Sequence, residues 1–279
     1  MSQVKSVIFK YPILASIVFL LASVFLTEIN FQDFLAPYLD FQNASYLVGI
    51  IEQGTVSVLL VILIGRLGIL KDAGFTGRIN WRSLWVIWPI FVYCVLNGGT
   101  SPFDGTFSID TSQPIRIVLY LLLYLSTGFF EEILFRGLIL NLFLRKWGTT
   151  RGGTYLAVVV SSSIFGIAHL INLVMGRRTL LSTLPQIAYG TFFGIFFAAC
   201  FLRNKSIWPV IFCHALFDMC GNFQDIAVGS LTFGKIEETS PEAALVTIAI
   251  MLPLMLYGFF LLRKSGPSDR GRAFSQAIV

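Results

Sequence analysis

Residues 117–144 read IVLYLLLYLSTGFFEEILFRGLILNLFL, an apolar run that contains two glutamates and one arginine. The run is longer than the ~20 apolar residues with which a helix crosses a bilayer. Each ionisable side chain near the bilayer centre costs about 3 kcal/mol on insertion scales. We therefore interpret Glu131, Glu132 and Arg136 as functional residues of a membrane-spanning helix.

The whole chain has the composition of an integral membrane protein. Of its 279 residues 56% are hydrophobic and 13% are charged, whereas soluble domains are about 25% charged. Apolar segments predict eight spans, at 12–27, 44–66, 84–97, 115–136 (or 115–145), 154–173, 183–202, 207–221 and 243–262. No linker or soluble domain separates them. We predict an all-α, polytopic helix bundle that forms a single integral membrane domain over residues 1–279.

Charged residues alternate between the connections that join these segments. One set is basic and includes Lys10, Arg145 and Lys264, while the other is mainly acidic and includes Asp40 and Glu237. Under the positive-inside rule, this pattern predicts a multi-pass protein of the cell membrane with both termini in the cytoplasm. The net charge of +5 then reflects topology. No basic face of a soluble module is present, so nucleic acid is not an expected partner.

Helix geometry divides the roles of the two glutamates. Glu132 and Arg136 are four residues apart, so they share a helix face and are expected to pair. Glu131 is rotated by about 100° from its neighbour and has no cationic partner on its own helix. It is therefore the carboxylate available for general-base chemistry.

The chain has only two histidines, and both lie in predicted spans. His214 and Asp218 are four residues apart and share a helix face. Small residues precede His169, including Gly166, and they allow helices to approach closely. We expect one polar centre, built from the helices that carry the two glutamates and the two histidines.

Three motifs in this order resemble the signature of a known family. They are Glu131-Glu132-x-x-x-Arg136, Phe165-x-x-x-His169 and His214-x-x-x-Asp218. The chain here is similar to the CPBP (CAAX protease and bacteriocin-processing, or Abi) intramembrane proteases, which include the prenyl-protein CAAX endopeptidases. The resemblance covers about residues 115–222 and implies a four-helix catalytic core.

The resemblance implies an intramembrane endopeptidase of the glutamic type. In it Glu131 would deprotonate a water molecule that His169 holds, while Glu132 and Arg136 orient the site. The substrate would be a peptide or protein, lipidated or membrane-bound, that approaches from the lipid bilayer. No cofactor is implied.

The last motif differs from the pattern of the better-characterised CAAX endopeptidases, which have asparagine where this chain has Asp218. His214 and Asp218 would occupy the place of the family's oxyanion-stabilising pair. An ionised aspartate only accepts hydrogen bonds and would repel an oxyanion. We therefore predict that Asp218 holds the imidazole of His214.

Two other classes of function fit the same residues. Glutamate, histidine and aspartate are zinc ligands, so a zinc-dependent membrane peptidase is an alternative; it is not favoured because the chain has no HExxH motif. A non-catalytic scaffold or bacteriocin self-immunity protein, which binds a membrane partner, is another. A transporter is a weaker alternative, because no paired interrupted helices are evident.

Helix rise raises a question about depth. Counted at ~1.5 Å per residue from the nearest basic connection, His214 lies shallower than Glu131 and His169. A break near Gly137, with residues 138–147 along the membrane interface, would bring Glu131 closer to the cytoplasm.

The remaining polar and aromatic residues in the spans have simpler interpretations. We predict packing for the four cysteines and for the phenylalanines at 192–197. Asn172 and Gln186 are each expected to form hydrogen bonds to other helices, with no partner assigned. Arg177 and Arg178 are interpreted as part of a solvated loop.

Overall fold

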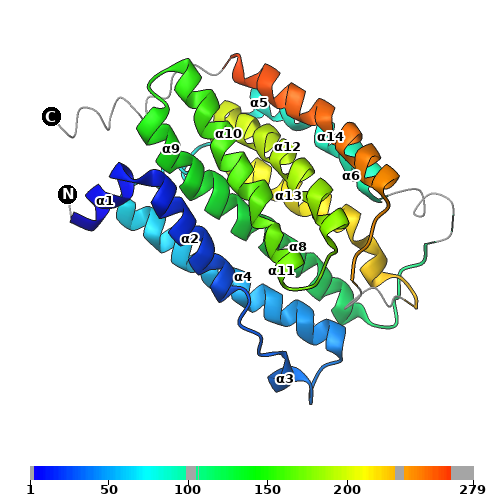
Figure 1. Cartoon of the computed structure of the whole chain (residues 1–279). Helices are drawn as coiled ribbons and strands as arrows, with labels where there is room; N and C mark the ends of the chain where they lie inside the picture. Colours follow the sequence, from blue (N-terminus) through cyan, green and yellow to red (C-terminus); the bar gives the residue numbers. More distant parts are fainter. Residues whose placement is uncertain (1–2, 99–104, 106, 230–235, 265–279) are drawn as a thin grey trace.

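The computed structural model describes residues 3–98, 105, 107–229 and 236–264. The helices run side by side in one bundle (Figure 1), and the described part of the chain contains two isolated bridges but no strand. The elements are α1 (Gln3–Lys10), α2 (Pro12–Leu26), α3 (Gln32–Leu35), α4 (Phe41–Leu67), α5 (Trp81–Leu84), η1 (Trp85–Ile87), α6 (Pro89–Gly98), α8 (Pro114–Glu132), η2 (Ile133–Ile139), α9 (Leu140–Trp147), α10 (Arg151–Ala168), α11 (Leu170–Val174), α12 (Leu180–Asn204), α13 (Trp208–Gly221), η3 (Phe223–Ile226) and α14 (Pro241–Leu262).

Five helices among the described residues are long and apolar enough to cross a membrane. They are Phe41–Leu67, Pro114–Trp147, Arg151–Val174, Leu180–Asn204 and Pro241–Leu262. The pair α1 and α2 would add a sixth, but it is bent by 103°. The chain is thus an all-α, multi-pass membrane protein, while the predicted count of eight is not confirmed. Segment 84–97 is divided between α5, η1 and the ten residues of α6, and α13 has 14 residues.

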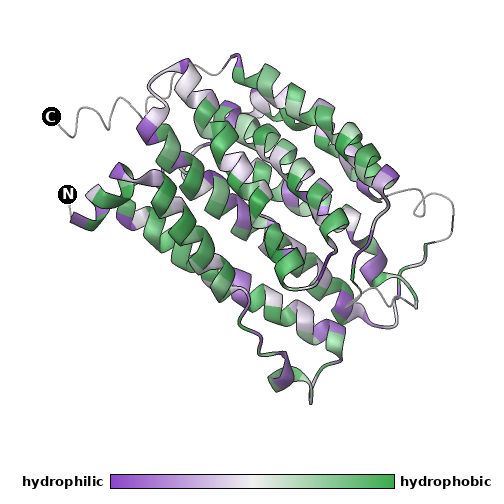
Figure 2. Ribbon diagram, in the orientation of Figure 1, coloured by the Kyte–Doolittle hydropathy of each residue, from purple (hydrophilic) through white to green (hydrophobic). Residues whose placement is uncertain are grey.

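Hydrophobic residues extend along most of the length of the helices (Figure 2), and many of them are exposed. Large hydrophobic side chains that are more than 50% exposed include Leu21 and Phe25 on α2, Val58 on α4, and Leu245 and Phe260 on α14. Soluble monomers rarely expose continuous apolar surface of this kind. The surface is suited to contact with lipid chains.

Helix α12 lies at the centre of the bundle. It packs against α10 on one side and α14 on the other, while α8 packs against α4 and α13. Glycines allow the close approaches: a Cβ on Gly166 of α10 would lie 2.5 Å from the carbonyl oxygen of Ile187 on α12. A Cβ on Gly258 of α14 would lie 3.0 Å from the backbone of Phe196 on α12. The predicted use of small residues for helix contact is confirmed at Gly166.

The chain has no break at Gly137, so the proposed interfacial segment is wrong. Residues Pro114–Trp147 form one helix, and its middle part, η2, is a π-helix. The Asn141 side-chain amide donates to the carbonyl oxygens of Arg136 and Gly137, both at 2.9 Å. These bonds satisfy acceptors that the wider π turn displaces, and the helix continues.

Arg177 and Arg178, the arginines of the predicted solvated loop, form ion pairs. Arg177 binds Glu28 through both guanidinium nitrogens, at 2.9 and 2.6 Å, and Arg178 pairs with Glu237. The connection between α11 and α12 is therefore fastened to the end of α2 and to the segment that precedes α14.

Other interpretations of single residues are confirmed. The Asn172 amide donates to the side-chain oxygen of Gln186 at 3.1 Å, which joins α11 to α12. The four cysteines are free thiols, of which two are buried and two partly buried: Cys94, Cys200, Cys213 and Cys220.

We expect Gly166→Ala to destabilise the protein by about 1–3 kcal/mol, because the new methyl group has no room between α10 and α12. Gly152→Ala, in the same helix, is the matched control, since a Cβ there meets no atom within 4 Å. The measurement is thermal unfolding in detergent micelles. Equal midpoints for the two variants would contradict the close packing at Gly166.

Candidate active site

A buried ion pair forms the base of the site. The Arg136 guanidinium donates from Nη1 to Glu132 Oε1 at 2.8 Å, and the two side chains are 3% and 0% exposed. The predicted pair is therefore present. Arg136 also lies over the ring of Phe165, 4.7 Å from its centroid, and 5.7 Å from that of Phe197. These cation–π contacts replace water around the guanidinium.

The same glutamate holds the second histidine. His214 Nδ1 lies 2.7 Å from Glu132 Oε1, and this nitrogen donates because a carboxylate oxygen accepts. The contact depends on close packing between α8 and α13: a Cβ on Gly128 would lie 2.9 Å from the backbone nitrogen of Ala215. Gly128 is one turn before Glu132, and Ala215 follows His214, so this approach brings ring and carboxylate together.

The other ring nitrogen of His214 faces two more carboxylates. Nε2 lies 3.4 Å from Glu131 Oε2 and 3.6 Å from Asp218 Oδ2. Glu131 has no cationic partner on its own helix, as expected, but α13 supplies His214 as a partner from another helix. The side chains of Glu131 and Asp218 are each 22% exposed, whereas Glu132 is 0% exposed. Water can therefore reach the first two carboxylates more easily than the third.

His169 lies at the end of α10 and is held by its own helix. Its Nδ1 is 3.0 Å from the carbonyl oxygen of Phe165, which can only accept, so Nδ1 carries the proton and Nε2 of the neutral ring has a lone pair. The Phe165 ring lies 5.1 Å from the ring of His169 and 5.9 Å from that of His214. Phe165 thus contacts both imidazoles. Five of the six predicted residues meet directly, and His169 joins them across this ring.

The start of α13 is buried against the connection that follows α4. Ser206 and Ile207, which precede the helix, are fully buried. The Ile207 amide donates to the carbonyl oxygen of Gly74 at 3.3 Å, and the Trp208 indole donates to that of Phe75 at 3.3 Å. The helix therefore begins inside the protein, although the neighbouring Lys205 is exposed. His214 meets Glu131 and Glu132 in the structure, which counting along straight helices did not predict.

One comparison with known proteins matches this part of the chain. Residues 113–220 match the family described as type II CAAX prenyl endopeptidase Rce1-like. The resemblance predicted from the three motifs is confirmed for this segment. The matched segment runs from the start of α8 into α13 and contains the whole polar cluster. Comparisons with curated proteins and with solved structures gave no significant match.

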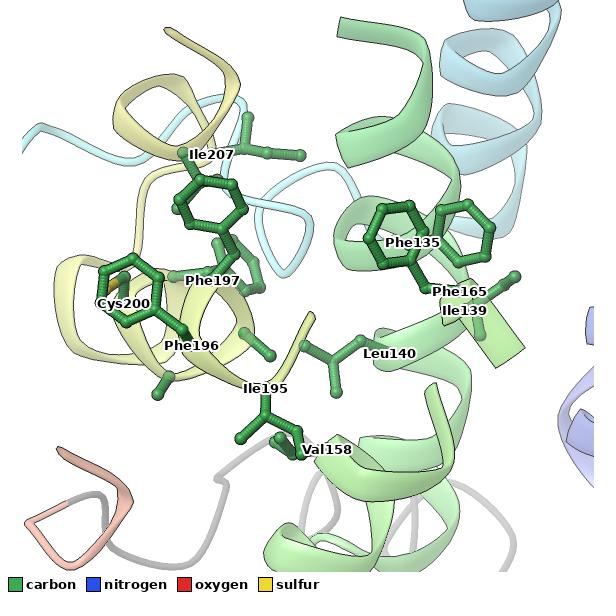
Figure 3. Packing of buried hydrophobic residues seen from close by; sticks show 14 of the residues in the cluster. Phe135, Ile139, Leu140, Val158, Phe165, Ile195, Phe196, Phe197, Cys200 and Ile207 are labelled. Carbon is green, nitrogen blue, oxygen red and sulfur yellow. The ribbon is translucent and has the colours of Figure 1, made fainter. Parts of the chain in front are cut away.

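Two aromatic residues of the site, Phe193 and Phe197, were not predicted from the sequence to contact the polar cluster. The rings of Phe193 and Phe197, from α12, lie 5.4 and 5.5 Å from the ring of His214. Figure 3 shows Phe197 in the buried cluster, and Phe165 against Phe135. From the sequence, the phenylalanines at 192–197 were predicted only to pack between helices. The available signal was the four-residue spacing, which places Phe193 and Phe197 on one face of α12. Their apolar walls strengthen the electrostatic contacts of the polar cluster.

The polar cluster contains residue types that bind metal ions. Within the described ranges, no group of three or more His, Cys, Asp and Glu side chains has a geometry that could hold one. His214 Nδ1 donates to Glu132, so this nitrogen has no lone pair available for a metal ion.

We expect Glu132→Gln to cost about 3–5 kcal/mol of stability, because it leaves the buried guanidinium of Arg136 without a counter-charge. Glu131→Gln, at the adjacent and more exposed carboxylate, is the matched control and should cost less than about 1 kcal/mol. Thermal unfolding of the two purified variants checks this. An equal loss in both would show that the carboxylates do not divide into structural and accessible roles.

Proposed function

We propose that the chain is an intramembrane endopeptidase that hydrolyses a peptide bond with a water molecule activated by Glu131. The observation that carries this proposal is the placement of His214. Its Nδ1 is bound to the buried Glu132, and its Nε2 faces the accessible Glu131. A fixed imidazole beside an accessible carboxylate is an arrangement that general acid–base chemistry requires.

The roles of the two glutamates follow from their surroundings. Glu132 Oε1 already accepts from Arg136 and His214, so it holds the site together. Glu131 is more exposed, which supports its role as the base that takes a proton from water. The lone pair on Nε2 of His169 would accept a hydrogen bond from the other O–H of that water and so orient its oxygen, while that hydrogen stays on the oxygen.

The reaction then proceeds in two stages. The water oxygen forms a bond to the carbonyl carbon of the peptide as its proton passes to Glu131, and the carbonyl oxygen becomes an oxyanion. The carbon–nitrogen bond breaks as Glu131 returns the proton to the leaving amine, giving a carboxylic acid and an amine. To stabilise the oxyanion His214 must donate from Nε2, and it must be an imidazolium because Nδ1 already donates to Glu132.

The name of the matched family suggests the substrate. It describes a CAAX prenyl endopeptidase, so we propose a prenylated protein or peptide that approaches through the membrane. The basic connections lie in the cytoplasm in this proposal, in line with the positive-inside rule. A farnesylated peptide with a CAAX terminus is the first probe.

Glu131→Gln should lower kcat/KM on this probe by at least about 100-fold, as should His169→Ala, because each removes a partner of the attacking water. The measurement is product release from protein reconstituted in vesicles. Glu52→Gln is the matched control for the first variant, since Glu52 is a partly buried carboxylate of α4 that lies outside the polar cluster. It should retain wild-type turnover.

Retained turnover in a folded Glu131→Gln protein would contradict the assigned base. Stoichiometric zinc in the purified protein, together with loss of turnover on chelation, would favour the zinc-peptidase alternative instead. If the probe is not cleaved, the membrane proteomes of cells with wild-type protein and of cells with the Glu131→Gln variant are compared. Uncleaved peptides that accumulate only in the variant cells identify other substrates. The absence of any difference would favour the scaffold.

Asp218→Asn should retain or raise turnover. Asparagine keeps an oxygen near Nε2 of His214, where Asp218 Oδ2 lies at 3.6 Å, and it removes a negative charge that would repel the oxyanion. The same vesicle assay measures the effect. Complete loss of turnover in a folded Asp218→Asn protein would show that the carboxylate itself is required.

A further inference from the structure

A hollow lies at the end of the bundle where α1 and α2 meet α9, apart from the polar cluster. Its volume is about 410 Å³, and its lining includes Lys10, Tyr11, Leu14, Ile17, Lys146 and Trp147. This volume falls within the range of about 300–1,000 Å³ that is typical of ligand sites. None of its lining residues contributes to the proposed catalysis.

The bend of the N-terminal helices forms one wall of the hollow. Helices α1 and α2 meet at 103°, and Pro12 starts the second helix at its first turn. α1 is anchored by Phe9, whose side chain is buried and whose ring lies 5.0 Å from the guanidinium carbon of Arg145 on α9. Both helices pack against α9 (Figure 1). The hollow therefore lies between this bent pair of helices and α9.

The charges around the hollow are unbalanced. Arg145, next to Lys146 in the chain, has its own counter-ion, with Nη2 2.6 Å from Asp72 Oδ2. Within the part of the chain that the structure describes, neither Lys10 nor Lys146 has an acidic partner, and both are exposed. Lys10 Nζ lies 5.3 Å from the centroid of the Tyr11 ring. Two lysines that line one hollow favour an anionic group at its edge.

The rest of the lining is apolar or aromatic. Leu14 and Ile17 are 60% and 43% exposed on α2, so they offer a surface for a hydrocarbon chain. Tyr11 and Trp147 are residue types that membrane proteins place at the level of the lipid headgroups. Charge and apolar surface together match a molecule with an anionic head and an acyl tail.

We propose that this hollow binds one anionic glycerophospholipid, with its phosphate between Lys10 and Lys146 and an acyl chain along Leu14 and Ile17. The bilayer supplies such lipids, and the hollow lies at the basic end of the bundle, where a negatively charged leaflet is expected. The bound lipid would join α2 to α9, which continues directly from the π-helix that carries Arg136.

The test measures lipid retention and thermal unfolding of the full-length protein in detergent. Phosphatidylglycerol should remain bound as one molecule in native mass spectra and should raise the unfolding midpoint, whereas phosphatidylcholine should do neither. The double variant Lys10→Gln/Lys146→Gln should weaken retention about 25-fold, since each lysine near an anionic lipid contributes a factor of about five.

The matched control is Lys71→Gln/Lys264→Gln. It removes the same charge from two other exposed lysines at this end of the bundle, and it should bind phosphatidylglycerol like the wild type. Leu14→Gln tests the apolar wall and should weaken retention without a change in charge. Glu131→Gln should bind the lipid normally, so failure of the proposed endopeptidase activity would leave this result unaffected.

Three outcomes would overturn the proposal. Equal retention of phosphatidylcholine would show that the lysines do not select the headgroup. Displacement of the lipid by inorganic phosphate would identify a site for free anions. An equal loss of binding in the control variant would show that only net charge matters.

Discussion

A single carboxylate oxygen connects the elements of the polar centre. Glu132 Oε1 accepts hydrogen bonds from Arg136 in η2 and from His214 in α13, at 2.8 and 2.7 Å. In surroundings of low dielectric, a charged group without its partners is expensive. Each of the three side chains is therefore stable at its position only because the other two are present, and the packing of α8 against α13 must preserve their contact.

The π-helix η2 places Arg136 for this contact within a membrane-spanning segment. A wider turn changes the direction in which side chains leave the helix, and it also displaces carbonyl groups that no lipid can satisfy. Asn141 supplies the missing donors from the next turn. The one polar residue between Leu138 and Leu144 thus allows an irregular turn and an uninterrupted 34-residue helix to exist together.

The sequence predicted those contacts that are set within one helix. The pairs Glu132 with Arg136 and His214 with Asp218 follow from four-residue spacing. The bond from His214 to Glu132 could not be predicted, because it depends on how closely Gly128 allows α13 to approach. The number of spans was uncertain for a related reason: hydropathy detects an apolar segment such as 84–97, but it does not show where a short helix begins or ends.

The hydrogen bond of His169 has a consequence for how the site could be altered. The partner of its Nδ1 is the backbone carbonyl of Phe165, so the last turn of α10 decides which ring nitrogen carries the proton. Unwinding of that turn would release Nδ1 and allow the proton to move to Nε2, which converts an acceptor into a donor. Backbone conformation at the end of α10 thus sets whether Nε2 of His169 accepts or donates, and a shift in α10 would reverse this without the exchange of any side chain.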